Sequence, residues 1–300
     1  NNVLDNVVSS IYVMVEPACF GIYVEEELDL DGNPDIPTDE PTVMTDVSWS
    51  ITGNQMTGQF YNGILLDLDT EVESPDCYVV QNYAADISGN TLDYAFDGGL
   101  GVAMEHDNEG YGYTEINLDV NIENNVVVMF GEYDLGPRSS NGLFVGPEGE
   151  DRELNDLIGE TFVVNVLIAG NTISGADTGI VVGERNSGGT AEEEGVYVNE
   201  VNVLVENNYI NNSEYGIVVN YASAIISNNV LEDCGTGIGL DYASGEVVGN
   251  TITCGIGVYI NYPMEVLVQG NTITHESHGV YVWYYYNEST SVQVLDNVIK

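Results

Sequence analysis

An acidic segment near the start of the chain has oxygen-bearing side chains at the spacing of a calcium-binding loop. They occur at alternate positions with a carboxylate at the twelfth place: Asp29, Asp31, Asn33, Asp35 and Glu40. Hard divalent cations need several such oxygens on a short turn. Pro34 stands where an EF-hand loop has glycine, so a solvated acidic loop is the alternative. The segment is therefore a candidate Ca2+ site.

Two of the three histidines, His275 and His278, form an H-x-x-H pattern that could begin a metal site. Such a site needs further ligands nearby, and the sequence places none in register with them. Surface histidines are the favoured interpretation.

Ten asparagines in one recurring local pattern reveal the elements that must position these groups. Apolar residues stand three places before and two places after each of them, which is the period-two alternation of strands with one buried face. The ten are Asn6, Asn54, Asn90, Asn125, Asn171, Asn208, Asn229, Asn250, Asn271 and Asn297. The pattern predicts a structural asparagine ladder, with amides bonding along the stack at a bend. A plain turn former is the alternative.

Glycines open a second apolar run in each repeat, and they are expected to permit a bend into a second strand. The interval from Asn208 to Asn229, Asn250 and Asn271 is 21 residues each time, which is too short for a crossover helix. It fits one coil of a solenoid in which identical positions stack about 4.8 Å apart. The sequence therefore predicts an all-β, single-stranded right-handed parallel β-helix of about nine coils.

Longer intervals before residue 160 indicate insertions into the same solenoid. The expected excursions are residues 25–46, 105–117, 146–160 and 183–195, which are rich in Asp, Glu, Gly and Pro. We expect one domain over residues 1–300, with insertion-rich coils over 1–160 and tight coils over 161–300.

Two further ladders follow from the repeat. Cys234 and Cys254 each lie three residues before a repeated glycine, so stacking brings them within disulfide range, with buried free thiols as the alternative. Cys19 and Cys77 fall in the first two coils and are a second candidate pair, and two bridges indicate an oxidising compartment.

Four tyrosines stand five residues after successive glycines and form a predicted aromatic ladder: Tyr221, Tyr242, Tyr262 and Tyr284. Such a ladder is suited to coil stacking, to a contact between subunits or to binding of sugar rings.

These repeats resemble the right-handed parallel β-helix proteins, the broad group that contains the pectate-lyase-like enzymes and many secreted or cell-surface proteins. The resemblance covers the whole chain, but the fold hosts lyases, hydrolases, adhesins and inert fibres alike. The lyases of the group use a basic residue beside calcium, and the hydrolases use adjacent aspartates and Gly-His-Gly. In this sequence the basic residues are not clustered and no Asp-Asp pair occurs. Ser277-His278-Gly279 matches the Gly-His-Gly element only in part. No enzyme is expected, and a polysaccharide lyase or hydrolase is the alternative.

The charge excludes several partners. Four Lys and Arg stand against 49 Asp and Glu, giving a formal net charge of −45. Nucleic acid and anionic membranes are repelled, and cations are attracted. No segment has the roughly 18 apolar residues of a membrane span. Two sequons, at Asn211 and Asn287, are possible glycosylation sites and fit an extracellular location. The composition is similar in style to envelope proteins of methanogenic or salt-adapted archaea.

The two ends of the chain share one repeat element. The sequence of Asn2–Val8 matches that of Gln293–Ile299, and neither end has a recognisable polar or helical cap sequence. Either the chain is a fragment of a longer array, or copies stack head-to-tail into a fibre. We therefore expect an extracellular structural protein that polymerises into a cell-surface sheath, fibre or layer. The alternative is a carbohydrate-binding or carbohydrate-processing β-helix protein with glycan partners.

Overall fold

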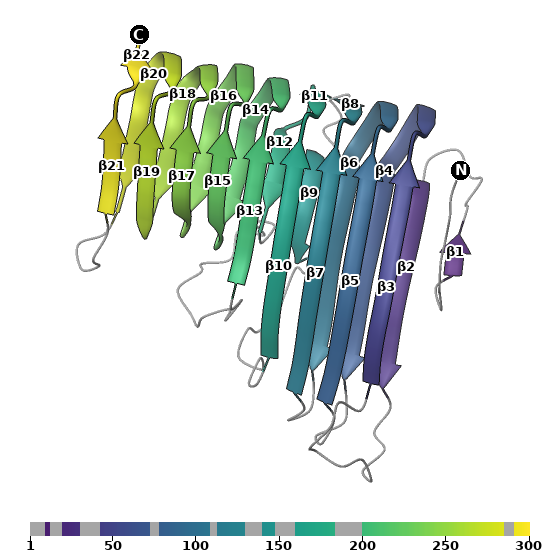
Figure 1. The fold of residues 1–300 in the computed structure, drawn as a ribbon. Helices are drawn as coiled ribbons and strands as arrows, with labels where there is room; N and C mark the ends of the chain where they lie inside the picture. Colours follow the sequence, from purple (N-terminus) through teal and green to yellow (C-terminus); the bar gives the residue numbers. More distant parts are fainter. Residues whose placement is uncertain are drawn as a thin grey trace.

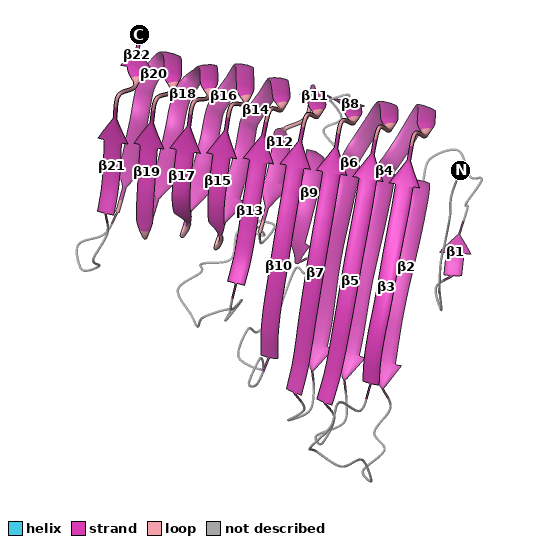
Figure 2. Ribbon diagram, in the orientation of Figure 1, coloured by secondary structure: helices cyan, strands magenta, loops and turns pink. Residues whose placement is uncertain are grey.

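The computed structural model describes residues 10–12, 20–30, 43–72, 78–108, 113–129, 140–147, 160–183, 200–284 and 291–300. Within these ranges all regular structure is β-strand, arranged as two sheets that run the length of the molecule (Figures 1 and 2). None of this described part forms a helix long and apolar enough to cross a membrane.

Sheet A contains nine strands among the described residues, ordered along the molecule as they occur in the chain. They are β3 (Val43–Thr52), β5 (Tyr78–Ser88), β7 (Tyr113–Glu123), β10 (Glu160–Ala169), β13 (Glu200–Glu206), β15 (Ser223–Ser227), β17 (Ser244–Val248), β19 (Glu265–Gln269) and β21 (Ser291–Leu295).

Sheet B contains thirteen described strands and carries the other half of each coil. They are β1 (Ser10–Tyr12), β2 (Phe20–Leu30), β4 (Gln55–Val72), β6 (Thr91–Asn108), β8 (Val126–Met129), β9 (Asn141–Pro147), β11 (Thr172–Ser174), β12 (Thr178–Val182), β14 (Tyr209–Asn220), β16 (Val230–Asp241), β18 (Thr251–Asn261), β20 (Thr272–Trp283) and β22 (Val298–Ile299).

The chain alternates between the two sheets, and each strand pairs in parallel with its equivalent one coil away. Connections of this kind, without crossover helices, define a parallel β-helix and confirm the predicted fold class. The two predicted apolar columns line its interior: Ile226 and Val247 from sheet A, and Leu231 and Ile252 from sheet B, are fully buried. They belong to one hydrophobic cluster that extends from Val24 to Ile273.

The turn from sheet A to sheet B has a local cause in the residue before each ladder asparagine. That residue has a positive φ in every described coil, between 55° and 69°, and it is always Gly, Asn or Asp. These residue types adopt the left-handed conformation at least cost. The nine residues are Gly53, Gly89, Asn124, Gly170, Asn207, Asn228, Gly249, Gly270 and Asp296.

The repeated glycines of sheet B are explained by space and not by a special backbone angle. A Cβ on Gly237 would lie 2.7 Å from the carbonyl oxygen of Gly257 and 2.6 Å from Cγ2 of Ile252 in the next coil. In the coil near residue 100 the glycine in this column is Gly99, which aligns with Gly63, and not Gly101 as the sequence spacing suggests. Close approach of successive coils therefore replaces the bend predicted from sequence.

Much of the predicted insertion sequence forms longer strands. β2 continues to Leu30 and pairs with β4 through Val72, whereas the expected excursion began at residue 25. β6 likewise continues to Asn108, β7 begins at Tyr113 and β9 ends at Pro147. Neighbouring coils extend together, so each added residue has a backbone partner. Figure 1 shows the resulting long strands in the N-terminal half and short ones in the C-terminal half.

The N-terminal end departs from the repeat. β1 pairs with β2 in antiparallel orientation, Ser10 opposite Glu25 and Tyr12 opposite Tyr23. An edge strand of this orientation differs from the parallel coil predicted around Asn6, which itself lies outside the described residues.

Candidate functional site

The asparagines form a continuous column inside the turn between the sheets. Each Nδ2 donates to Oδ1 of the asparagine in the next coil at 2.9–3.0 Å, in eight consecutive steps from Asn54 to Asn297. The same oxygens accept the backbone N–H of the preceding asparagine at 2.8–3.0 Å. The column includes all six asparagines proposed as a structural ladder: Asn171, Asn208, Asn229, Asn250, Asn271 and Asn297.

The second amide hydrogen of each asparagine from Asn90 to Asn297 is also used. It donates to a backbone carbonyl of the preceding coil, as in Asn229 to Val205 at 2.9 Å and Asn250 to Ile226 at 2.9 Å. Buried amides with donors and acceptors satisfied in this way stabilise the stack and are not available to a ligand. This bonding agrees with the structural role predicted for the ladder.

The two thiols predicted to pair lie in one column at the bend of sheet B. Cys234 of β16 is in direct register with Cys254 of β18, and both are buried as free cysteines. A hydrogen bond between the thiols raises the pKa of Cys234, reinforced by burial, and lowers the pKa of Cys254. The Cys234–Cys254 disulfide remains a prediction, and Cys19 and Cys77 lie outside the described residues.

His275 belongs to this same column, which the H-x-x-H interpretation missed. It is in register with Cys254, whereas His278 pairs with Ile256. Nδ1 of His275 is buried and has no hydrogen-bond partner. The same holds for Oγ of Ser213, which precedes Cys234 in the column. His278 is exposed, and its Nδ1 lies 2.6 Å from Oγ of Ser277. A register shift between Cys254 and Ile256 hides the alignment in the sequence.

Three of the four ladder tyrosines stack face to face at the turn after sheet B. The ring centroids of Tyr221 and Tyr242 are 5.0 Å apart, and those of Tyr242 and Tyr262 are 4.5 Å apart. Tyr284 follows Trp283, which is in register with Asn261, so it occupies the fourth position of this series. Because the flat faces of the middle ring contact other rings, this geometry favours coil stacking over a platform for sugars.

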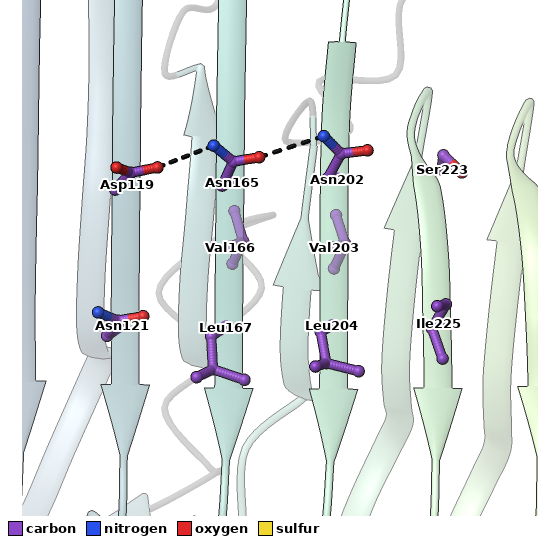
Figure 3. A pocket seen from close by; sticks show the side chains of 10 residues that line it. All are labelled: Asp119, Asn121, Asn165, Val166, Leu167, Asn202, Val203, Leu204, Ser223 and Ile225. Atoms are coloured by element: carbon purple, nitrogen blue, oxygen red, sulfur yellow. Dashed lines mark hydrogen bonds between the residues drawn. The ribbon is translucent and has the colours of Figure 1, made fainter.

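A depression of 440 Å³ lies on the outer face of sheet A, over β7, β10, β13 and β15 (Figure 3). One row is polar: Asn165 donates to Asp119 at 2.8 Å, and Asn202 donates to Asn165 at 3.1 Å. A second row contains Leu167, Leu204 and Ile225. Asp119 is the one carboxylate among its lining residues, whereas glycoside hydrolysis uses two.

Of the predicted calcium ligands, Asp29 lies in β2 opposite Glu71, so it is part of a strand. Asp31, Asn33, Asp35 and Glu40 lie outside the described residues. In the described ranges, no three His, Cys, Asp or Glu side chains converge on one point. Of the two sequons, Asn211 is half-buried in β14 with Ser213 buried, and Asn287 lies outside the description.

A half-buried carboxylate, Asp241, interrupts a row of amides between Asn220 and Asn261. Burial raises the pKa of Asp241 above its ordinary 3.8, although Asn261 donates to it at 2.8 Å. Since the folded-state pKa exceeds the unfolded one, stability decreases as pH rises from about 3.8 through the folded-state pKa. We expect Asp241→Asn to stabilise the fold at pH 7 by up to about 1 kcal/mol, an effect that vanishes below pH 4 or so.

Urea unfolding at several pH values measures this effect. Asp233→Asn is the matched control, because it removes the same charge from an exposed position in the same strand. Equal stabilisation by both variants at pH 7 would show that net charge, and not burial of Asp241, is responsible.

The stacked sheets and the internal asparagine ladder define the class of the molecule: a parallel β-helix solenoid. Residues 161–300 match the model of the family described as "Periplasmic copper-binding protein (NosD)", a family of parallel β-helix proteins. The matched part starts in β10 and contains the cysteine column and the tyrosine ladder. No curated protein and no solved structure matches the chain.

Proposed function

We propose that this chain is a non-enzymatic structural β-helix on the extracytoplasmic side of the cell, which assembles end to end into a surface sheath, fibre or layer. The observation that supports it is the C-terminal coil. Val294 and Ile299 are 44% and 45% exposed, although their equivalents one coil earlier, Val268 and Ile273, are fully buried. Their equivalents face the core, so a further coil stacked on this end would cover them.

The occupant that fits this end is the N-terminal coil of a second copy. From β2 to β22 the strands of stacked coils pair in parallel, so a copy in the same orientation would continue both sheets. At the N-terminal end Val47, Trp49 and Ile51 are already buried. Contact there uses the backbone edge of β3, in the manner of strand addition, whereas part of the edge of β2 is already paired with β1.

Salt decides whether such contacts form. Copies with a formal charge of −45 repel one another, and the range of repulsion decreases from about 10 Å at 0.1 M salt to about 3 Å at 1 M. Covering a Val or Ile side chain contributes about 1.5–3 kcal/mol. Assembly is therefore expected at high salt or with divalent cations, which suits a salt-adapted surface.

Light scattering and electron microscopy test this proposal. The chain is expected to form end-to-end oligomers or filaments in 1 M salt, and Ile299→Lys is expected to abolish them. Thr272→Lys is the control, because it adds the same charge to an exposed outward position one coil earlier. Monomers at every salt concentration, or filaments of Ile299→Lys equal to those of the unaltered chain, would contradict the proposal.

A second candidate function, binding of a copper ion, has one observation in its favour. The segment that matches the family described as copper-binding contains two buried free thiols in register, Cys234 and Cys254. Thiolates are the soft ligands that monovalent copper prefers. The carbohydrate alternative has less support, because the tyrosine faces stack on one another and the outer depression has no aromatic residue.

A further inference from the structure

Four consecutive coils place a different polar or sulfur-containing side chain at one position of the sheet B bend. Ser213, Cys234, Cys254 and His275 are in register across β14, β16, β18 and β20. Cys234 and Cys254 are 6% and 5% exposed, and His275 is half-buried. Two sulfur atoms and one imidazole therefore follow one another along the solenoid axis.

The donor atoms of this column have weak partners or none, since the two thiols hydrogen-bond to each other. Sγ of Cys234 lies 3.4 Å from the carbonyl oxygen of Glu232, and Sγ of Cys254 lies 3.8 Å from that of Leu231. Nδ1 of His275 and Oγ of Ser213 are buried without any hydrogen bond. Buried polar atoms are nearly always partnered, so an imidazole nitrogen without a partner one coil from Cys254 indicates a missing ligand.

The surroundings hold the two sulfurs at a fixed spacing. Both cysteines are followed by glycine, and a Cβ on Gly255 would lie 2.8 Å from the carbonyl oxygen of Gly235. A Cβ on Gly237 would lie 3.4 Å from Sγ of Cys254. These close backbone contacts keep the two coils at the regular spacing of about 4.8 Å.

We infer that Cys234 and Cys254 form a binding site for one Cu(I) ion, with His275 as the next polar side chain of the column beside it. Metal–thiolate bonds of about 2.3 Å, the value for zinc, span about 4.6 Å when two lie in line, which matches the coil spacing. Zinc takes four ligands, and no three His, Cys, Asp or Glu side chains converge among the described residues. A two-coordinate soft ion needs only the two thiolates, and this inference rests on the second proposed function.

Binding is an exchange of protons for metal without electron transfer. Each thiol releases its proton to solvent as its sulfur bonds the ion, and copper enters and stays as Cu(I). The disulfide predicted from the sequence uses the same two sulfurs and requires an oxidant. The reduced pair therefore binds copper and the oxidised pair does not, so the protein is reduced before the test.

Anaerobic titration with Cu(I), in competition with a colorimetric Cu(I) chelator, measures the site. We expect one ion per reduced chain, sulfur neighbours in the X-ray absorption spectrum, and protection of both thiols from alkylation. Cys234→Ser and Cys254→Ser should each weaken binding at least 100-fold. Serine is tolerated at this position of the column, as Ser213 demonstrates one coil earlier. His275→Gln should weaken binding about 10-fold.

His278→Gln is the matched control, because it removes an exposed imidazole three residues away and should leave binding unchanged. Unchanged copper stoichiometry in the cysteine variants, equal loss in His278→Gln, or a Cys234–Cys254 disulfide that resists reduction would each overturn the inference. The non-assembling Ile299→Lys variant should bind copper normally. Loss of copper binding and loss of assembly are thus separate results.

Discussion

Replacing Asn229 with alanine is expected to lower the free energy of unfolding by about 3–5 kcal/mol. Its side chain accepts the backbone N–H and Nδ2 of Asn208, at 2.9 and 3.0 Å. It donates to the carbonyl of Val205 and to Oδ1 of Asn250. Alanine leaves these groups unpaired in a fully buried position, where each costs about 1–3 kcal/mol. Urea unfolding followed by circular dichroism measures the loss.

The neighbouring residue provides the control for this variant. Asn228 is exposed and has φ = 56°, so Asn228→Gly removes an amide without straining the turn and should change stability little. Asn229→Asp should be as damaging as alanine, because an ionised carboxylate cannot donate to Val205. A loss for Asn229→Ala no larger than that for Asn228→Gly would refute the structural role of the ladder.

Gly237→Ala is expected to cost about 2–3 kcal/mol, although it adds a single methyl group. The new Cβ would lie 2.7 Å from the carbonyl oxygen of Gly257 and 2.6 Å from Cγ2 of Ile252. The carbonyl belongs to the backbone of a hydrogen-bonded strand and cannot rotate away, so two coils must separate locally.

Gly239→Ala in the same strand is the matched comparison. Its Cβ would meet Val218 at 3.7 Å, an ordinary contact, and its effect should remain within about 0.5 kcal/mol. Thermal unfolding of both variants compares them directly. If Gly239→Ala were as destabilising as Gly237→Ala, loss of glycine flexibility and not close coil contact would be the cause.

The fold was predictable because each coil repeats the same physical problem. Apolar residues at fixed distances from each asparagine must face one interior, and the structure buries Ile226, Leu231, Val247 and Ile252 accordingly. The register between the tight coils follows directly from the 21-residue interval. The positive φ before each asparagine was also readable, since only Gly, Asn and Asp occupy that position.

Other features depend on pairs of coils and were not readable from one repeat. The long N-terminal strands exist because neighbouring coils lengthen together. Their sequence is rich in Asp and Glu, which led to the prediction of loops. The outer ladders were also missed: Asn82 donates to Asp46, and Asn165 donates to Asp119. Each places a carboxylate at the start of an amide row, at positions that do not recur through the repeat.

The candidate metal column was half predictable. Equal distances to the following glycine aligned Cys234 with Cys254 correctly. His275 has one more residue before Gly279, so the same count excluded it, and the register shift in β18 restores the alignment in space. A one-residue register shift cannot be detected by counting positions with a fixed repeat length.

The asparagine column also has a direction. Every amide-to-amide bond points from the earlier coil to the later one, so one extremity offers an amide nitrogen and the other an amide oxygen. Two molecules that meet with like ends would set donor against donor, or acceptor against acceptor. A polymer that extends this column therefore has no two-fold symmetry axis at the junctions between copies. Its two ends differ chemically.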